Sequence, residues 1–126
     1  MLGIESQNNT PLLGHVEGKL TPCPDKPNCV SSFAEDNHKI DPLKGTQKVT
    51  ELKNAILSLG GAKLEQEEDN YLRFSFKSKI FKFVDDLEFY KTDSIWHVRS
   101  ASRVGHSDMD ANRKRVEKIR KLLQEK

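Results

Sequence analysis

The chain has no long hydrophobic run and almost no net charge. Nowhere in its 126 residues do about 18 apolar residues follow one another, so we expect no membrane-spanning segment. Residues 1–20 also lack the basic-then-apolar pattern of a signal peptide. The formal charge of +2 predicts no strong attraction to nucleic acid or anionic lipid. The sequence as it stands is therefore expected to be soluble, and its charge gives no guide to partners or oligomeric state.

Cysteine is also scarce, since only Cys23 and Cys29 are present. Prolines at positions 22, 24 and 27 exclude a helix around them and favour extended or turning backbone. We favour a disulfide, which implies an oxidising compartment. The alternatives are a zinc pair completed by His15 and His38, or two reduced structural thiols. Because the histidine spacings fit no known zinc pattern, we expect no metal, and we expect no cofactor.

The length and composition predict one globular domain. A hydrophobic share of 35% and a charged share of 32% are typical of a soluble domain that buries a single core. Residues 1–21 contain glycine, asparagine and proline without periodicity, so we expect an irregular arm there, partly disordered. Residues 22–126 are expected to form a single α+β domain.

Apolar periodicity predicts the main elements. Spacings of three and four from Val49 to Leu59 indicate a helix, which Gly60 and Gly61 end. The period then changes to two, which indicates four strands: one beginning at 62, then 71–77, 83–90 and 95–102. A last helix is expected from Ser107, with Asn112 inside its apolar stripe, where a buried amide would need partners. The expected fold is a four-stranded antiparallel sheet with two helices packed on one face, in the order helix, four strands, helix.

A four-residue connection over 91–94 would place Tyr90 opposite Ile95. One face of this ladder is expected to form the core. The cross-strand pairs that follow are Phe89 with Trp96, Leu87 with Val98 and Asp85 with Ser100 on the core face, and Glu88 with His97 and Asp86 with Arg99 on the polar face.

Polar residues gather where the last strand leads into the last helix, and we expect them to converge near one corner. An arginine fork beside hydroxyls suits a carboxylate or phosphate ligand, whereas the structural alternative is that these groups only fix the corner. The candidates for this ligand site are Asp85, Asp86, Arg99, Ser100, Ser102, Arg103, Ser107, Asp108, Asn112 and Arg113.

Catalysis has weaker support, and no catalytic residue is assigned. Ser100 and His97 would point to opposite faces of a strand, and no Gly-x-Ser-x-Gly elbow is present. The basic run over 113–121 has no interleaved aromatic positions, which favours a solvated helix face over a nucleic-acid site. The polar sheet face could be bare surface, a ligand platform or an interface with another subunit.

Three ordered motifs carry a family resemblance. They are PCPDKPNCVSS at 22–32, FVDDLEF at 83–89, and VRSASRVG at 98–105 followed by Ser107, Asp108, Asn112 and Arg113. Together they resemble the domain of unknown function family numbered 1499, over roughly 12–123. The resemblance implies no established reaction, and it supports the disulfide.

The resemblance also bears on location, since many relatives look like envelope lipoproteins in which a stretch similar to 13–20 follows a lipidated cysteine. That cysteine is absent from this sequence. We expect a periplasmic or envelope-associated protein if the chain is a trimmed form, and a cytoplasmic one if Met1 is the natural start.

The leading functional hypothesis is a noncatalytic binding or accessory module, with an anionic ligand or a protein partner near Arg99 and Arg103. The first alternative is a small hydrolase or isomerase that uses Asp85 or Asp86 as a base. The second is a structural envelope protein that pairs through its polar sheet face.

Overall fold

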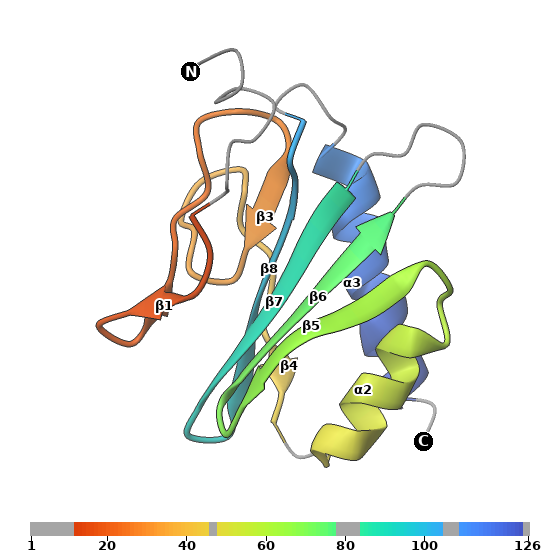
Figure 1. The fold of residues 1–126 in the computed structure, drawn as a ribbon. Helices are drawn as coiled ribbons and strands as arrows, with labels where there is room; N and C mark the ends of the chain where they lie inside the picture. The colour runs from red at the N-terminus through yellow and green to blue at the C-terminus, as the bar shows by residue number, and fades with distance from the viewer. Residues whose placement is uncertain (1–11, 46–47, 78–83, 105–108, 125–126) are drawn as a thin grey trace, which may run out of the picture.

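The computed structural model describes residues 12–45, 48–77, 84–104 and 109–124. The elements, in chain order, are β1 (His15–Val16), β2 (Lys19–Leu20), β3 (Cys29–Ser31), β4 (Leu43–Lys44), α2 (Val49–Leu57), β5 (Ala62–Glu68), β6 (Tyr71–Lys77), β7 (Val84–Thr92), β8 (Ile95–Ser102) and α3 (Met109–Gln124). Helices α2 and α3 lie together against the sheet (Figure 1).

The α+β class is confirmed, but the main sheet has six strands rather than four. Its order is β3-β8-β7-β6-β5, every neighbouring pair is antiparallel, and β4 also pairs with β8. The four expected strands are β5 to β8. The two additional strands contain three and two residues, which is too short for an alternating pattern to reveal them.

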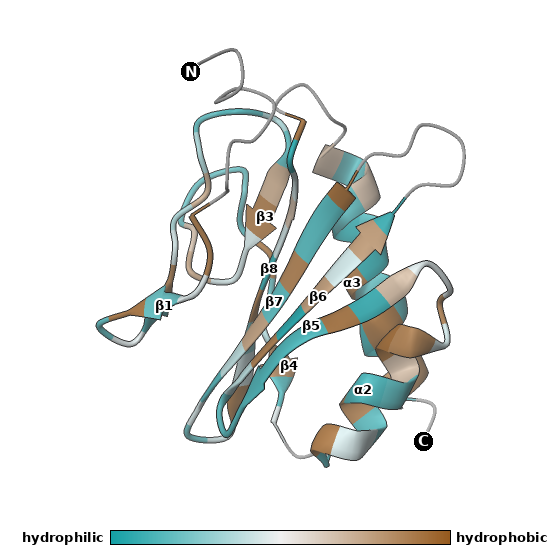
Figure 2. Ribbon diagram, in the orientation of Figure 1, coloured by the Kyte–Doolittle hydropathy of each residue, from teal (hydrophilic) through white to brown (hydrophobic). Residues whose placement is uncertain are grey.

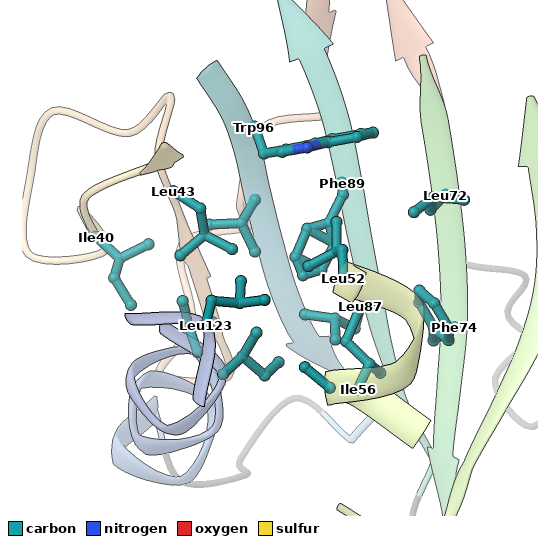
Figure 3. Close-up of a cluster of buried hydrophobic side chains, with 14 of the residues drawn as sticks. Ile40, Leu43, Leu52, Ile56, Leu72, Phe74, Leu87, Phe89, Trp96 and Leu123 are labelled. Atoms are coloured by element: carbon teal, nitrogen blue, oxygen red, sulfur yellow. The ribbon is translucent and has the colours of Figure 1, made fainter. Parts of the chain in front are cut away.

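The core lies between the helices and one face of the sheet. Alternating residues of the strands point toward the helices, as the alternating hydropathy of β6 and β7 in Figure 2 indicates. In Figure 3, Leu52 and Ile56 of α2 lie against Phe74, Leu87 and Phe89 of the sheet. Burial of these side chains is the main stabilising term for the fold.

The β7–β8 pairing differs from the expected register by two residues. The turn contains only Asp93 and Ser94, because the strands continue through Thr92 and Ile95, which pair. Asp93 takes the left-handed conformation that such tight turns need (φ 52°). A shift of two keeps every side chain on its expected face but changes its partner. The observed pairs are Phe89 with Val98, Leu87 with Ser100, Asp85 with Ser102, Glu88 with Arg99, and Asp86 with Ala101.

Residues 12–21 of the arm lie on the sheet face opposite the helices. Strands β1 and β2 form a small hairpin, and Leu20 packs with Tyr71 and Tyr90 in a second apolar cluster. The His15 ring stacks on Tyr90, with centroids 4.3 Å apart. This part of the arm therefore covers polar positions of the strands. The alternating pattern alone places these positions on a solvent-exposed face of the sheet. Residues 1–11, where disorder is expected, lie outside the described residues.

Cys23 and Cys29 form a disulfide, so the favoured alternative is confirmed. The two sulfur atoms are bonded to each other rather than available to zinc. The bond closes the segment from Cys23 to Cys29, which leads directly into β3. This segment and the preceding Pro22 are called the disulfide loop below.

Reduction of this disulfide is expected to lower the free energy of unfolding by about 2 kcal/mol, because it closes a short loop in the unfolded chain. Thermal unfolding with and without reductant measures the effect. The double variant Cys23→Ser/Cys29→Ser is expected to have the melting temperature of the reduced protein. Added reductant is expected to leave this temperature unchanged. Equal melting temperatures for oxidised and reduced protein would contradict the expectation.

Candidate functional site

The structure distributes the candidate residues over both faces of the sheet. Asp86, Arg99 and Arg103 belong to the face under the arm, whereas Asp85, Ser100 and Asn112 lie on the helix side. Arg113 donates hydrogen bonds to the carbonyls of Lys39 and Asn37, away from both groups. Ser107 and Asp108 lie outside the described residues.

A buried charge cluster lies at the centre of the face under the arm. The Glu88 side chain is 0% exposed, and its Oε2 accepts hydrogen bonds from the Tyr71 hydroxyl and the Gly14 backbone N–H, each at 2.6 Å. Arg99 donates from Nη1 to Oε1 of Glu88 at 3.4 Å. Burial lowers the pKa of Arg99, against the opposing effect of Glu88. Burial, together with the hydrogen bond to Glu88, raises the pKa of Tyr71.

Asp86 and Arg103 form a second, bidentate ion pair on this face. Arg103 donates from Nε to Oδ2 at 2.9 Å and from Nη2 to Oδ1 at 3.1 Å. The hydrogen bond to Asp86 raises the pKa of Arg103. The Asp86 side chain is buried, whereas that of Arg103 is 42% exposed. The Arg103 side chain is therefore partly exposed to solvent at the edge of this site.

A pocket of about 430 Å³ opens beside these two ion pairs. Three of its lining residues are charged, namely Arg99, Arg103 and Asp86. The others are apolar or uncharged polar residues from the arm, the disulfide loop and β8. The lining residues are Leu12, Thr21, Pro22, Pro24, Asn28, Asp86, Arg99, Ala101, Ser102 and Arg103. Its size is within the range of pockets that hold small molecules.

Two polar atoms of the pocket residues lack partners in the described part of the chain. They are Nε of Arg99 and Oδ1 of Asn28, both in residues that are only 5% exposed. Buried polar groups in folded proteins normally have partners. Both residues line the pocket, but these two atoms are themselves buried in the protein.

The disulfide loop is fastened to the sheet and to α3 at this pocket. Asn28 donates from Nδ2 to the Ser102 carbonyl at 2.8 Å, and Arg99 donates from Nη2 to the Pro22 carbonyl at 3.4 Å. Asn112 of α3 donates to the Asn28 carbonyl at 3.4 Å. The hydroxyl of Ser102 accepts the Val104 N–H. The three bonds made by Asn28, Arg99 and Asn112 fix the disulfide loop as one wall of the pocket.

The helix-side candidates form a network with Arg115, which Asn112 joins to the disulfide loop. Ser100 donates to Oδ1 of Asn112 at 2.7 Å, and Arg115 donates to both Ser100 Oγ and Asn112 Oδ1 at 3.2 Å. Arg115 also pairs with Asp85 at 2.8 Å. The prediction that a buried Asn112 needs partners is confirmed. In the basic run of this helix the lysines at 114, 118 and 121 are exposed, whereas Arg113, Arg115 and Arg120 are partly buried and donate hydrogen bonds within the protein.

His97 is paired with a serine that the sequence did not single out. Its Nδ1 lies 2.9 Å from Ser32 Oγ, and its ring stacks on Phe33 with centroids 3.9 Å apart. Burial lowers the pKa of His97. Ser32 Oγ also accepts the Val98 N–H at 2.9 Å, so this hydroxyl joins β8 to the segment after β3. Ser32 is buried, which suits a structural role.

The fold and the pocket define a class: a two-layer α+β domain whose arm and disulfide loop cover the polar sheet face beside a small pocket. Within the described ranges, no helix is long and apolar enough to cross a membrane. Nor do three or more histidine, cysteine or acidic side chains gather there in a way that could hold a metal ion.

The chain belongs to the family described as Protein of unknown function (DUF1499), whose sequence model matches residues 19–123. The resemblance seen in the three motifs is therefore confirmed. None of the curated proteins compared with the chain matches it. The family match covers the disulfide loop, both ion pairs and α3 up to residue 123, but it names no ligand or reaction.

Proposed function

We propose that this protein is a noncatalytic binding module that holds a small molecule with one anionic group and an apolar body. The observation that carries the proposal is the pocket of about 430 Å³ whose lining combines two arginines, Arg99 and Arg103, with the apolar residues Pro22, Pro24 and Ala101. Pockets that combine apolar walls with a few polar groups are typical of small-molecule sites.

The charges of the lining favour an anion. Two arginines and one aspartate line the pocket, and Asp86 is already engaged by Arg103. Arg99 makes its two side-chain hydrogen bonds at 3.4 Å, the long end of the range, so its guanidinium retains donor capacity. A guanidinium recognises a planar carboxylate well because its donors form a rigid fork.

The two alternatives have less support from the geometry. In the enzyme alternative, Asp85 or Asp86 acts as a base. Asp85 is paired with Arg115 at 2.8 Å and Asp86 with Arg103 at 2.9 Å, so either carboxylate would first have to break its ion pair. Pairing through the polar sheet face would need Glu88 and Arg99 at the surface, yet the arm covers both. A concave pocket also suits a small molecule better than a flat protein partner.

Calorimetric titration with octanoate, compared with 1-octanol, tests this function. The carboxylate is expected to bind at least about tenfold more tightly than the alcohol, which has the same chain but no charge to pair with arginine. Failure of both probes to bind would overturn an apolar anion as the ligand class. Equal binding of both would overturn the role of the arginines.

A pocket-filling variant locates the binding. Ala101→Leu places a larger apolar side chain in the lining without removing any charge, so it is expected to abolish octanoate binding. The matched control is Ala111→Leu, which makes the same change at an exposed position of α3. Unchanged binding in Ala101→Leu would mean that octanoate binds elsewhere.

A further inference from the structure

His38 is buried between two hydrogen-bond acceptors. Its Nδ1 lies 2.9 Å from Oδ1 of Asp36, and its Nε2 lies 2.9 Å from the backbone carbonyl oxygen of Lys26. A neutral imidazole has one N–H and can donate to only one of these oxygens, whereas the imidazolium donates to both. The arrangement around His38 is therefore complementary to the charged form of its ring.

The charged groups around the ring favour this form. Asp36 faces Nδ1, Asp25 lies on the disulfide loop, and Glu35 and Lys19 line the same small hollow as His38. The hydrogen bond to the Lys26 carbonyl, followed by that to Asp36, raises the pKa of His38 against the effect of burial. Hydrogen bonds from the backbone and ring of His38 lower the pKa of Asp36, which keeps its carboxylate ionised.

His38 links β3 to the disulfide loop. Its backbone carbonyl accepts the N–H of Ser31, the last residue of β3, at 2.9 Å. Its ring meets the loop at Lys26, whose own N–H donates to the Pro24 carbonyl at 2.8 Å. Pro24, with Pro22 and Asn28 of the same loop, lines the pocket assigned to the ligand. The His38 ring thus connects the sheet to the disulfide loop, which forms one wall of the pocket.

We propose that the imidazolium of His38 is a positioning group that holds the disulfide loop in its pocket-forming conformation, so that ligand binding weakens when His38 loses its proton. The pH dependence of binding rests on the proposed function, whereas the dependence of the loop on His38 does not. The disulfide closes the loop on itself, and His38 ties the closed loop to the sheet.

The direction of the pH effect follows from the geometry. The ring is protonated at acidic pH and donates both hydrogen bonds. As pH rises through the raised pKa of His38, the bond to Asp36 or that to Lys26 is lost. Binding is therefore strongest at the acidic end and falls at pH values above about 6.5, the ordinary histidine value.

Nuclear magnetic resonance between about pH 5.5 and about pH 9 tests the loop directly, without a ligand. The His38 ring signals are expected to titrate with a midpoint above the ordinary histidine value, and the backbone amides of Lys26 and Asn28 are expected to shift with the same midpoint. Asp36→Asn is expected to lower this midpoint. The control Glu35→Gln changes a neighbouring carboxylate that makes no hydrogen bond with the ring among the described residues, and it is expected to leave the midpoint unchanged.

Octanoate titrations over the same pH range test the consequence for binding. The dissociation constant is expected to rise about tenfold from the acidic to the basic end, the effect of losing one charge-assisted hydrogen bond. The dependence should disappear in His38→Gln, whose amide can donate to Lys26 at every pH.

The outcomes separate the two proposals. Loop amides that do not follow the His38 titration, or octanoate binding that is independent of pH, would overturn the role of His38. If the loop follows the titration and octanoate binds at no pH, the role of His38 stands and the proposed function fails. If His38→Gln does not fold, the wild-type and Asp36→Asn titrations still decide the question.

Discussion

Arg99→Met is expected to destabilise the protein by about 3–5 kcal/mol, the cost of leaving a buried charge without its partner. Glu88 is fully buried beneath the arm, and Arg99 is the cation that contacts it in the described structure. The Tyr71 and Gly14 donors remain in the variant, but they carry no charge to balance the carboxylate. Equilibrium unfolding in urea measures the change in free energy.

A double-mutant cycle distinguishes the ion pair from lost packing. Glu88→Gln removes the charge while keeping the shape, so Arg99→Met/Glu88→Gln is expected to be more stable than Arg99→Met alone. Arg73→Met is the matched control, because Arg73 lies opposite Glu88 on β6 but is only half-buried. A loss in Arg73→Met as large as that in Arg99→Met would show that removing any arginine from this face has the same effect.

Arg99 both stabilises the fold and lines the pocket proposed to bind the ligand, so these two roles have to be measured by different variants. Its guanidinium donates hydrogen bonds to Glu88 and to the Pro22 carbonyl while it lines the pocket, so truncation removes these bonds as well as the proposed ligand contact. Ala101→Leu avoids the removal of a charged group, since it fills the pocket while Arg99, Arg103 and Asp86 stay in the chain. Binding and stability can therefore be assigned separately.

The faces of the strands could be predicted from the sequence, but their pairing could not. Alternation of apolar and polar residues determines which side of β7 and β8 meets the helices, and it remains correct under a two-residue shift. The pairing depends on the turn, where Lys91 and Thr92 read as loop residues but continue the strand. The Lys91 ammonium lies 5.6 Å from the centre of the Trp96 ring, a contact that appears only once the strands are paired.

Only part of the candidate site could be predicted from the sequence, and the reason is similar. Asp86, Arg99 and Arg103 share one strand face and could be selected from alternation. The hydrogen bond from Gly14 to Glu88 could not be predicted in this way, because Gly14 is 74 residues away in sequence. It meets Glu88 only when the arm folds over the sheet. His38 is equally hidden, since its partner Lys26 is in another loop. Contacts between irregular segments leave no periodic signal in a sequence.

Asn112→Leu is expected to destabilise the protein by about 2–3 kcal/mol, although it completes the apolar stripe of α3. Asn112 is fully buried and accepts a hydrogen bond from Ser100 at 2.7 Å. Leucine would leave that hydroxyl without its acceptor and would remove a contact between α3 and the Asn28 carbonyl of the disulfide loop. Urea unfolding measures the loss, with Ala111→Leu as the exposed control on the same helix.

Removing both polar partners separates the two contributions. Asn112→Leu/Ser100→Ala leaves no hydroxyl without an acceptor, but Arg115 Nη1 loses both of its acceptors and Arg115 keeps its ion pair with Asp85, so the double variant is expected to recover part of the stability lost in the single variant. Recovery of stability together with weaker octanoate binding would assign Asn112 to the positioning of the disulfide loop. A double variant as unstable as the single one would instead show that leucine does not fit between α3 and β8, because steric overpacking does not depend on the Ser100 hydroxyl.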